Sequence, residues 1–249
     1  DLTVITYLKL PVASAFQHVA IEFSNALQSN IPTSQESTNT MHHSKGTHSR
    51  PLFLLLTAEA CGEQNLTSVQ SAVLLELLHT ASLIHDDVVD ETKQRRGVPS
   101  VSAIYDNRIA VLVGDFILAD TLIRAVETGS KEIVKIIATL SREMAEGEIK
   151  QLENIYELIL KEKDYFIALE KKTAMLLSSC TEIGAITANA NIELQQKCKE
   201  FGQILGYCFQ LKDDLFDYFD CPEIGKPSGN DIREGKVTLP LIHALNKVS

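Results

Sequence analysis

The sequence is poor in positive charge, and this scarcity limits the partners that the chain of 249 residues can bind. Lys and Arg together number 23 against 33 Asp and Glu, which gives a formal net charge of -10. Binding of nucleic acid needs clustered positive charge, so the composition argues against DNA or RNA as a partner. A phosphate ligand is not excluded, because a few local basic groups or bound metal ions reverse the field inside one cleft.

Cysteine and long apolar runs are also scarce. The five cysteines include no CxxC pair, their number is odd, and a chain of this length needs no disulfide bonds to hold its core. We therefore expect reduced thiols and a cytoplasmic protein. No apolar run approaches the roughly 20 residues of a transmembrane helix. The apolar amino end, residues 2–16, is interrupted by Lys9 and Pro11 and lacks the layout of a signal peptide.

Proline is absent between residues 100 and 221, which favours long helices because proline breaks helix interiors. Apolar residues recur at steps of three and four, as expected for one face of a helix, at Val73, Leu77, Ala81, Ile84 and Val88. Strand-type alternation with Asn-Gly or Asp-Gly turns is missing. The sequence therefore predicts an all-α fold, a single-domain helical bundle over residues 1–249. Residues 33–49 and 221–236 are polar or rich in proline and glycine, and we expect them to be loops.

Two acidic clusters of the form D-D-x-x-D lie inside the helical pattern. Their members are Asp86, Asp87 and Asp90 in the first cluster, and Asp213, Asp214 and Asp217 in the second. Residues i and i+4 of a helix are neighbours, and like charges at this spacing destabilise an isolated helix by a few tenths of a kcal/mol. Two such clusters in otherwise apolar helices therefore call for a cation. Carboxylate oxygens suit Mg²⁺, which usually bridges carboxylates to substrate phosphates.

Two simpler explanations compete with a metal site. Each cluster alone could be a solvated acidic helix face, but two copies flanked by apolar residues make that explanation weak. A calcium-binding EF-hand starting at Asp213 fails, because Tyr218 stands at the sixth position, where that loop needs glycine.

These residues resemble those of the trans-isoprenyl diphosphate synthase family, and most of all its bacterial long-chain polyprenyl members. The stretch from Leu77 to Gly97, LLHTASLIHDDVVDETKQRRG, resembles the family's first aspartate-rich motif with its trailing Arg-Arg. The stretch from Gly206 to Lys236 resembles the second motif and the Gly-Lys loop after it. Between them, GDFILAD, REMAEGEIKQ and EKKTAMLLSSC follow in the family's order. The resemblance covers residues 10 to 249.

The resemblance implies a fold and an activity. The fold would be an isoprenoid synthase bundle with a central substrate cavity. The enzyme would be a Mg²⁺-dependent prenyltransferase that condenses isopentenyl diphosphate with an allylic diphosphate such as farnesyl or geranylgeranyl diphosphate. The released diphosphate would act as the base, so no covalent nucleophile is required. A homodimer would form through helices near the first motif, and product release at a membrane surface is expected.

The resemblance also assigns roles to residues. All six aspartates would coordinate magnesium on the allylic diphosphate. Lys172, Lys226 and Lys236 would hold that diphosphate together with Arg95, while Thr173 and Gln210 would lie near the developing carbocation. The second substrate, isopentenyl diphosphate, would be bound by Arg50, His79 and Arg96.

Product length is partly readable from the same resemblance. In this family a bulky aromatic residue four or five positions before the first aspartate blocks the product tunnel. Ala81 and Ser82 occupy those positions here, so we expect a product longer than farnesyl diphosphate. The floor of the tunnel is expected near residues 116–121.

The chain departs from the family pattern in two places. The family carries Gly-Lys-x-x-Arg-Pro before the first motif, whereas this chain has Thr47 at the lysine position, and a hydroxyl group cannot supply the lysine's charge. The family also continues for several helices beyond the position of Ser249, so we expect C-terminal helices to be missing from this chain.

Three rival functions remain open. A class I terpene cyclase shares the fold and the first motif, but its second metal motif normally mixes Asn or Asp, Ser or Thr, and Glu. A metal phosphohydrolase with His-Asp ligands would use His79, His85 and Asp86 but leaves the second cluster unexplained. A non-catalytic or weakly active subunit of a heteromeric prenyltransferase would explain Thr47, although such a subunit has no need of both aspartate clusters.

Overall fold

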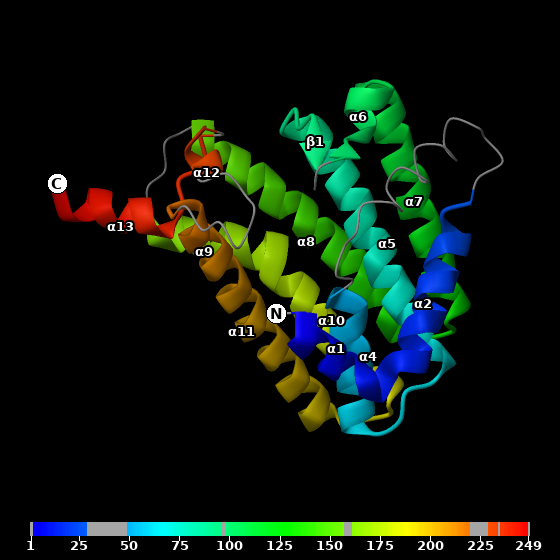
Figure 1. Cartoon of the computed structure of the whole chain (residues 1–249). Helices are drawn as coiled ribbons and strands as arrows, with labels where there is room; N and C mark the ends of the chain where they lie inside the picture. The colour runs from blue at the N-terminus through cyan, green and yellow to red at the C-terminus, as the bar shows by residue number, and fades with distance from the viewer. Residues whose placement is uncertain are drawn as a thin grey trace. The chain divides into compact units, whose positions relative to one another are not determined.

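The computed structural model describes residues 2–28, 49–95, 98–156, 161–219, 229–233 and 235–248. Helices dominate these residues, which confirms the predicted all-α class (Figure 1). The long proline-free stretch is helical almost throughout, as its composition predicts. The elements in chain order are α1 (Leu2–Lys9), η1 (Leu10–Val12), α2 (Ala13–Ala26), α4 (Ser49–Cys61), α5 (Leu66–Val89), β1 (Gln94–Arg95), β2 (Val98–Pro99), α6 (Val101–Ile104), α7 (Asn107–Glu127), α8 (Lys131–Tyr156), α9 (Glu162–Leu169), η2 (Glu170–Ala174), α10 (Met175–Thr187), α11 (Ile192–Asp217), α12 (Asn230–Arg233) and α13 (Leu239–Val248).

The chain divides into two compact units. Unit 1 contains Asp1–Ala138 and Cys180–Cys198, and unit 2 contains Thr139–Ser179 and Lys199–Ser249. The boundary falls inside α8, α10 and α11, so each of these helices contributes residues to both units. The single domain over residues 1–249 stays a prediction.

Helix α5 is the central element of unit 1 and packs against α2, α4 and α7 (Figure 1). It is apolar on several faces, as expected for a helix surrounded by others, and Leu74, Leu75 and Leu77 are fully buried. Its start is fixed by a capping box, in which the Asn65 side chain accepts from the Ser68 N–H at 3.1 Å and the Ser68 hydroxyl accepts from the Asn65 N–H. The first aspartate cluster, at the other end of α5, is therefore carried on a rigid helix.

In unit 1, α10 approaches α4 closely because a glycine stands at the contact. A Cβ atom at Gly184 would lie 2.5 Å from the Leu54 carbonyl oxygen and 3.0 Å from the Cβ of Thr57. The Asn65 side chain also donates to the Thr187 carbonyl at 2.7 Å. The end of α10 is thereby fixed to α4 and to the start of α5.

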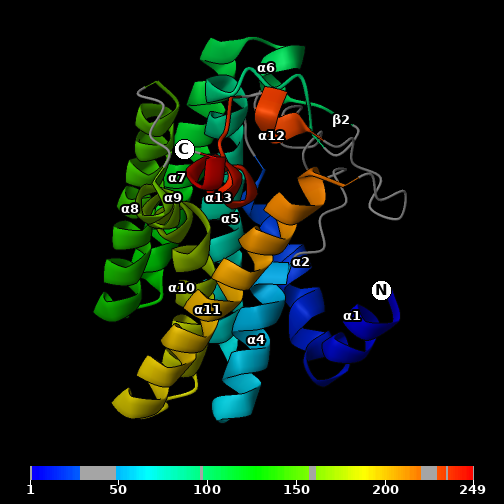
Figure 2. The same cartoon turned by 90° about the vertical axis from the view of Figure 1, so that its left-hand side faces the viewer.

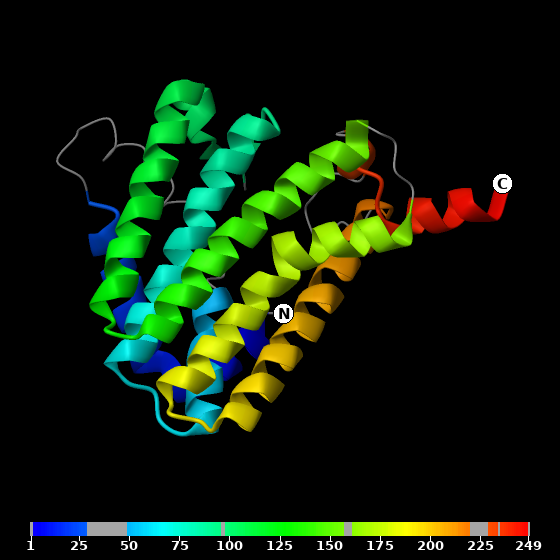
Figure 3. The ribbon, with the colours of Figure 1, turned by 180° about the vertical axis from the view of Figure 1, so that it is seen from behind.

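Unit 2 contains the run α9–η2 and the adjoining parts of α8, α10 and α11. Figure 3 shows α8 beside η2 and α11 on the other side of that run. Two glycines allow this packing. A Cβ atom at Gly147 on α8 would lie 2.8 Å from the Lys171 Cβ, and one at Gly206 on α11 would lie 2.5 Å from the Ala174 Cα. At the far end of the unit, α13 lies against α9 (Figure 2).

The structure differs from the sequence-based predictions in three details. Residues 230–233, inside the segment 221–236 that was predicted to be a loop, form the short helix α12. A short antiparallel pair, β1 with β2, follows α5 and matches Arg95 with Val98, although no strand was predicted. By length and composition alone, Val4–Ala26 also passes as one helix that could cross a membrane, against the expectation that no segment would. That segment includes the turn η1, and only 11% of its most apolar window is buried, although Val19 and Phe23 of α2 are buried in unit 1.

Candidate active site

The first aspartate cluster lies at the C-terminal end of α5 in unit 1. Asp87 is buried, with 6% of its surface exposed, whereas Asp86 and Asp90 are half-buried. The Arg95 guanidinium donates to the Asp87 Oδ1 atom through Nε at 2.8 Å and lies 2.7 Å from it through Nη2. The β1–β2 pair returns Arg95 to the end of α5. Asp87 and Arg95, both predicted as site residues, are therefore in direct contact.

A second group of residues lies beside this cluster on α7. The His85 Nε2 atom lies 3.4 Å from the Asp115 carboxylate and 3.2 Å from the Val111 carbonyl oxygen. A Cβ atom at Gly114 would overlap the His85 ring, so the glycine makes room for the imidazole. The Gly-Asp pair of the GDFILAD segment thus holds the histidine that immediately precedes Asp86.

Arg50 and His79, the residues predicted to bind isopentenyl diphosphate, are both half-buried in unit 1. Arg50 lies in the first turn of α4, and His79 lies on α5, seven residues before Asp86. Burial raises the pKa of the Cys180 thiol to about 12, while the positive charge of Arg50 acts in the opposite direction. Arg50 therefore lies within electrostatic reach of the core of unit 1.

The second cluster lies at the C-terminal end of α11 in unit 2. Asp213 is exposed, Asp217 is half-buried and Asp214 is buried, with 4% of its surface exposed. The Asp214 carboxylate accepts from the Tyr165 hydroxyl at 2.5 Å and from the Gln210 amide at 2.7 Å. Burial raises the pKa of Asp214, the two hydrogen bonds oppose this shift, and the charges of Asp213 and Asp217 add to it.

These contacts form a chain of hydrogen bonds across unit 2. The Thr173 hydroxyl donates to the Gln210 side-chain oxygen at 3.0 Å, and the Gln210 amide in turn donates to Asp214. Thr173 lies in η2 and Gln210 and Asp214 lie in α11. The structure thus brings together three predicted site residues that are up to 41 positions apart in the sequence.

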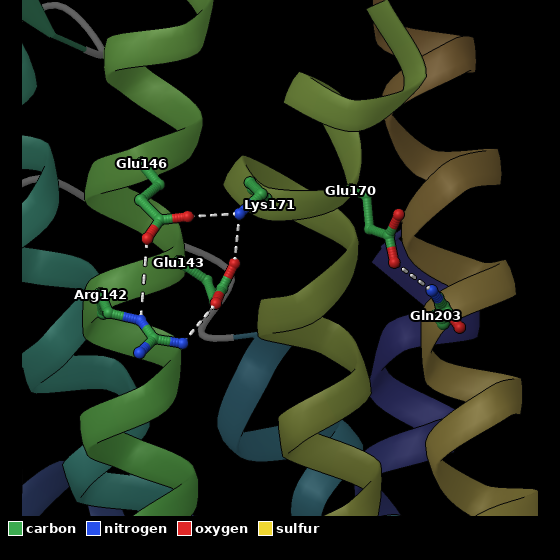
Figure 4. A network of polar contacts seen from close by, with 6 residues as sticks. All are labelled: Arg142, Glu143, Glu146, Glu170, Lys171 and Gln203. Atoms are coloured by element: carbon green, nitrogen blue, oxygen red, sulfur yellow. Dashed lines mark hydrogen bonds and ion pairs between the residues drawn. The ribbon is translucent and has the colours of Figure 1, made fainter. Parts of the chain in front are cut away.

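The segment Glu170–Ala174 is a π-helical turn, a local widening of the helix that occurs frequently at functional sites. Figure 4 shows how polar contacts fix its start. The Lys171 ammonium group donates at 2.5 Å to both Glu143 and Glu146 of α8, and Gln203 of α11 donates to Glu170 at 2.8 Å. The pKa of Glu143 is lowered, first by the hydrogen bond from Lys171 and then by that from Arg142.

Lys172 has different partners from its neighbour. Its ammonium group pairs with the Glu148 carboxylate and donates to the Gln151 side chain at 3.0 Å. Both partners belong to the REMAEGEIKQ segment of α8. Lys171 and Lys172 are thus held by separate groups, which distinguishes two lysines that look alike in the sequence.

Residues 229–231, which lie beyond the second cluster in the sequence, contact its last aspartate. The Asp217 carboxylate accepts from the Asp231 backbone N–H at 3.1 Å, and its carbonyl oxygen accepts from the Gly229 N–H at 2.7 Å. The Lys236 N–H donates to the Asp231 carbonyl at 2.8 Å, which ties the predicted diphosphate ligand Lys236 to the same residues.

Comparison with known proteins decides the family. The family model described as "Polyprenyl synthetase" matches residues 32–249. The chain belongs to the polyprenyl synthetase family. An octaprenyl diphosphate synthase of Escherichia coli (strain K12) is 38% identical over 202 residues, which cover 81% of this chain and 62% of that relative. An all-trans-nonaprenyl-diphosphate synthase of Rhodobacter capsulatus is 38% identical over 237 residues, covering 94% of this chain and 73% of the relative.

Solved structures agree with this membership in the polyprenyl synthetase family. A decaprenyl diphosphate synthase from Rhodobacter capsulatus matches with a TM-score of 0.93 at 36% identity, over 98% of this chain and 76% of that chain. A polyprenyl synthase from Caulobacter crescentus CB15, complexed with calcium and isoprenyl diphosphate, matches with a TM-score of 0.92 at 34% identity, over 98% and 75% of the two chains. The isoprenoid synthase fold predicted from the sequence is confirmed.

Some predicted site residues of this family member lie outside the described residues. These are Arg96 and Lys226, together with Thr47, the departure from the family pattern. The two aspartate clusters belong to different units, the first to unit 1 and the second to unit 2. The roles assigned to all of these residues stay predictions.

The aspartate clusters fit a divalent cation that is shared with a phosphate ligand. Across the part of the chain that the structure describes, no three His, Cys, Asp or Glu side chains are grouped closely enough to hold a metal ion by themselves. Magnesium commonly uses one or two carboxylates and completes its shell with water and substrate phosphates, so a full protein cage is not needed. The negative charges of Asp213 and Asp217, which raise the pKa of Asp214, are those that a cation would neutralise.

Sequence reasoning did not single out several residues that hold the predicted ones in place. Tyr165 binds Asp214, Glu148 and Gln151 bind Lys172, and Asp115 lies beside His85. Asp115 lies in the GDFILAD segment, and Glu148 and Gln151 lie in the REMAEGEIKQ segment. Both segments resemble family segments, and this resemblance was the signal that could have found the three residues. Tyr165 precedes the EKKTA segment by five positions and carries no such signal.

Proposed function

We propose that this protein is a long-chain trans-polyprenyl diphosphate synthase, which adds isopentenyl diphosphate units to an allylic diphosphate. The observation that carries the proposal is the pair of D-D-x-x-D clusters, each at the C-terminal end of a long helix, in a chain that belongs to the polyprenyl synthetase family. The chain spans 62% of the length of the Escherichia coli relative, so the activity of the whole protein is part of this proposal.

The aspartates and the basic residues share the task of binding the allylic diphosphate. The chemistry expected of Mg²⁺ at the two clusters is neutralisation of the diphosphate, which makes it a good leaving group. Arg95 is held beside the first cluster by Asp87, which supports a role in binding the same anion. Lys172 is oriented by Glu148 and Gln151 and supplies a further positive charge, as do Lys226 and Lys236.

Loss of the diphosphate leaves an allylic cation, and oriented dipoles of unit 2 support it. The Thr173 hydroxyl donates to the Gln210 side-chain oxygen, and the Gln210 amide nitrogen donates to Asp214. These two hydrogen bonds fix the orientation of the Thr173 and Gln210 side chains. Fixed dipoles stabilise a developing charge without reorganising during the reaction. Isopentenyl diphosphate, bound by Arg50, His79 and Arg96, then attacks through its double bond and loses a proton to the released diphosphate.

The residues before the first cluster support a product longer than farnesyl diphosphate. Ser82 is half-buried on α5, and its hydroxyl donates to the His79 carbonyl at 2.8 Å, so a small side chain turns back onto its own helix. Ala81 is buried. Neither residue presents the aromatic ring that ends the product tunnel of short-chain members. The named relatives that make octaprenyl and nonaprenyl diphosphates agree with this assignment.

A homodimer is part of the proposal and is supported by an apolar stripe on α7. Its side chains are 40 to 66% exposed although they are large and apolar. An exposed stripe of this kind on a helix beside the first motif marks a protein interface. The stripe consists of Val111, Leu112, Phe116, Leu122, Ile123 and Val126. Sedimentation velocity of a Leu112→Glu, Ile123→Glu variant is expected to show a monomer, and an unchanged dimer would place the interface elsewhere.

The proposal also includes a cytoplasmic location and release of the product at a membrane surface. The alternative is a weakly active subunit of a heteromeric prenyltransferase. Thr47 supports this alternative. So does the similarity to the heptaprenyl diphosphate synthase component 2 of Geobacillus stearothermophilus, which is 35% identical over 227 residues. The deciding test is incorporation of labelled isopentenyl diphosphate by the full-length protein alone. Elongation supports the synthase, and no elongation moves the assignment to the subunit.

A further inference from the structure

Two thiols from separate helices lie in contact in unit 1. Cys61 is the last residue of α4 and Cys198 lies in the first part of α11, 137 positions further along the chain. Their Sγ atoms are 3.6 Å apart, and both side chains are partly exposed. A disulfide bond has sulfur atoms about 2.05 Å apart, so side-chain rotation and a shift of about 1.5 Å would close it.

The backbone on both sides of the pair is fixed by α10. The Thr181 hydroxyl donates to the Cys198 carbonyl at 2.6 Å, which binds α11 to α10 at the cysteine itself. Next to Cys61, Gly62 lies so close to the residue that follows α10 that an added Cβ atom would be 3.2 Å from the Ala188 carbonyl oxygen. The proximity of the two thiols is therefore set by the packing of three helices and not by a loose loop.

The surroundings favour a covalent bond over a metal site. A structural zinc site uses four ligands, and over the described residues no group of three or more His, Cys, Asp or Glu side chains is close enough to hold a metal ion. The other described cysteines differ from the pair, since Cys180 is fully buried and Cys208 is exposed. Only two ligands are thus available at this position in the described part of the chain.

We propose that Cys61 and Cys198 form an intramolecular disulfide bond when the protein meets a low-molecular-weight disulfide such as oxidised glutathione. One protein thiolate attacks the small disulfide and releases a small thiolate, and the second protein thiolate then attacks the mixed disulfide and releases another. The two protein thiols lose two electrons and two protons. The small disulfide gains both and leaves as two thiols.

The order of the two attacks follows from burial. Burial raises the pKa of the Cys198 thiol to about 11, and the hydrogen bond with Cys61 acts in the same direction. A thiol with a raised pKa is a slow first nucleophile because the thiolate is the attacking form. Cys198 therefore acts second, in the intramolecular step, where its 3.6 Å separation from Cys61 offsets its low thiolate fraction.

The bond would have a measurable effect on stability. It would close a loop of the unfolded chain between residues 137 positions apart, and disulfides stabilise mainly by restricting the unfolded state, more so for long loops. We expect the melting temperature to rise by about 5–10 °C on oxidation. Reduction with dithiothreitol should return it to the starting value.

The test is non-reducing peptide mapping of the full-length protein after treatment with oxidised glutathione. Cleavage after glutamate should yield a linked pair of fragments, residues 60–63 with residues 194–200, from protein that runs as a covalent monomer. The Cys208→Ser variant should give the same pair and the same rise in melting temperature. The Cys61→Ser and Cys198→Ser variants should fold with the melting temperature of the reduced protein and show no rise with oxidant.

Two results would overturn the proposal. One is glutathione attached at Cys208 while the fragments containing Cys61 and Cys198 stay unlinked. The other is a linkage between Cys61 and Cys198 found only in covalent dimers, which would join two copies of the chain.

Discussion

The Tyr165 hydroxyl donates a hydrogen bond to the buried Asp214 carboxylate at 2.5 Å, between residues that are 49 positions apart. The tyrosine ring is held in place edge-on against Phe166, with ring centroids 5.3 Å apart. The bond lowers the pKa of Asp214 against the larger effect of burial. Burial, and after it the hydrogen bond to Asp214, raises the pKa of Tyr165. Tyr165 therefore opposes the protonation that burial favours at a predicted magnesium ligand.

Replacing Tyr165 by phenylalanine should weaken magnesium binding. The ring and its packing remain, but Asp214 loses one of its two donors. Partners of metal ligands typically change metal affinity by 10–100-fold, so we expect the Mg²⁺ concentration for half-maximal activity to rise roughly 10-fold. The matched control is Tyr156→Phe, because Tyr156 is 81% exposed. An unchanged Mg²⁺ dependence in Tyr165→Phe would show that the hydrogen bond has no part in metal binding.

The neighbouring lysines of η2 should respond differently to alanine substitution. Lys172 is half-buried and is predicted to hold the diphosphate, and removing one preorganised electrostatic group typically costs about 10²–10³ in rate, so Lys172→Ala should lower kcat/KM by roughly 100-fold or more. Lys171 pairs with Glu143 and Glu146, and its loss should instead lower the melting temperature by about 2–4 °C.

Steady-state kinetics and thermal unfolding of the two lysine variants separate these effects. Lys171→Ala serves as the control for charge, since both variants remove one positive charge from adjacent positions. If Lys171→Ala loses as much activity as Lys172→Ala, the separate roles assigned to the two lysines are wrong.

An alanine at Gly206 should disturb the π-helical turn from the side of α11. Its Cβ atom would lie 2.5 Å from the Ala174 Cα and 3.0 Å from the Ala174 Cβ, so backbone must move. Overpacking of this kind typically costs about 1–3 kcal/mol, and we expect the melting temperature to fall by roughly 3–10 °C. Cys208→Ala, an exposed position on the same helix, should change it by about 1 °C or less. An equally stable Gly206→Ala protein would contradict the close packing of η2 on α11.

An aromatic side chain at position 82 should shorten the product. Ser82 is half-buried whereas Ala81 is buried, so Ser82→Phe tests product length with less damage to the fold. We expect the longest product to fall toward farnesyl or geranylgeranyl diphosphate, measured by chromatography of the dephosphorylated products. Leu66→Phe, at an exposed position of the same helix, should leave the length unchanged. Products of unchanged length from Ser82→Phe would show that position 82 does not line the tunnel.

Much of the fold was predictable because its causes are local. The spacing of apolar residues and the absence of proline predicted the long helices, and the i, i+4 spacing of Asp86 with Asp90 and Asp213 with Asp217 predicted acidic faces on them. The two-residue strands β1 and β2 escaped prediction because they are too short for any alternation to show.

The contacts of the site were not predictable because they join distant parts of the chain. Nothing local distinguishes Lys171 from Lys172, and only the packing of α8 against η2 gives them different carboxylate partners. Likewise, the pairing of Tyr165 with Asp214 depends on how the run α9–η2–α10 meets α11. Nothing in the sequence distinguishes Gly147 and Gly206 from other helix glycines. Only the structure shows that both pack against the π-helical turn η2.

The most direct test of the central claim is elongation of farnesyl or geranylgeranyl diphosphate with labelled isopentenyl diphosphate and Mg²⁺ by the full-length protein. We expect long all-trans products that disappear in EDTA, in Asp86→Ala and in Asp213→Ala, and that persist in Asp164→Ala, which changes an acidic residue outside both clusters. No elongation by the unmodified protein, or elongation that survives both cluster variants, would contradict the central claim.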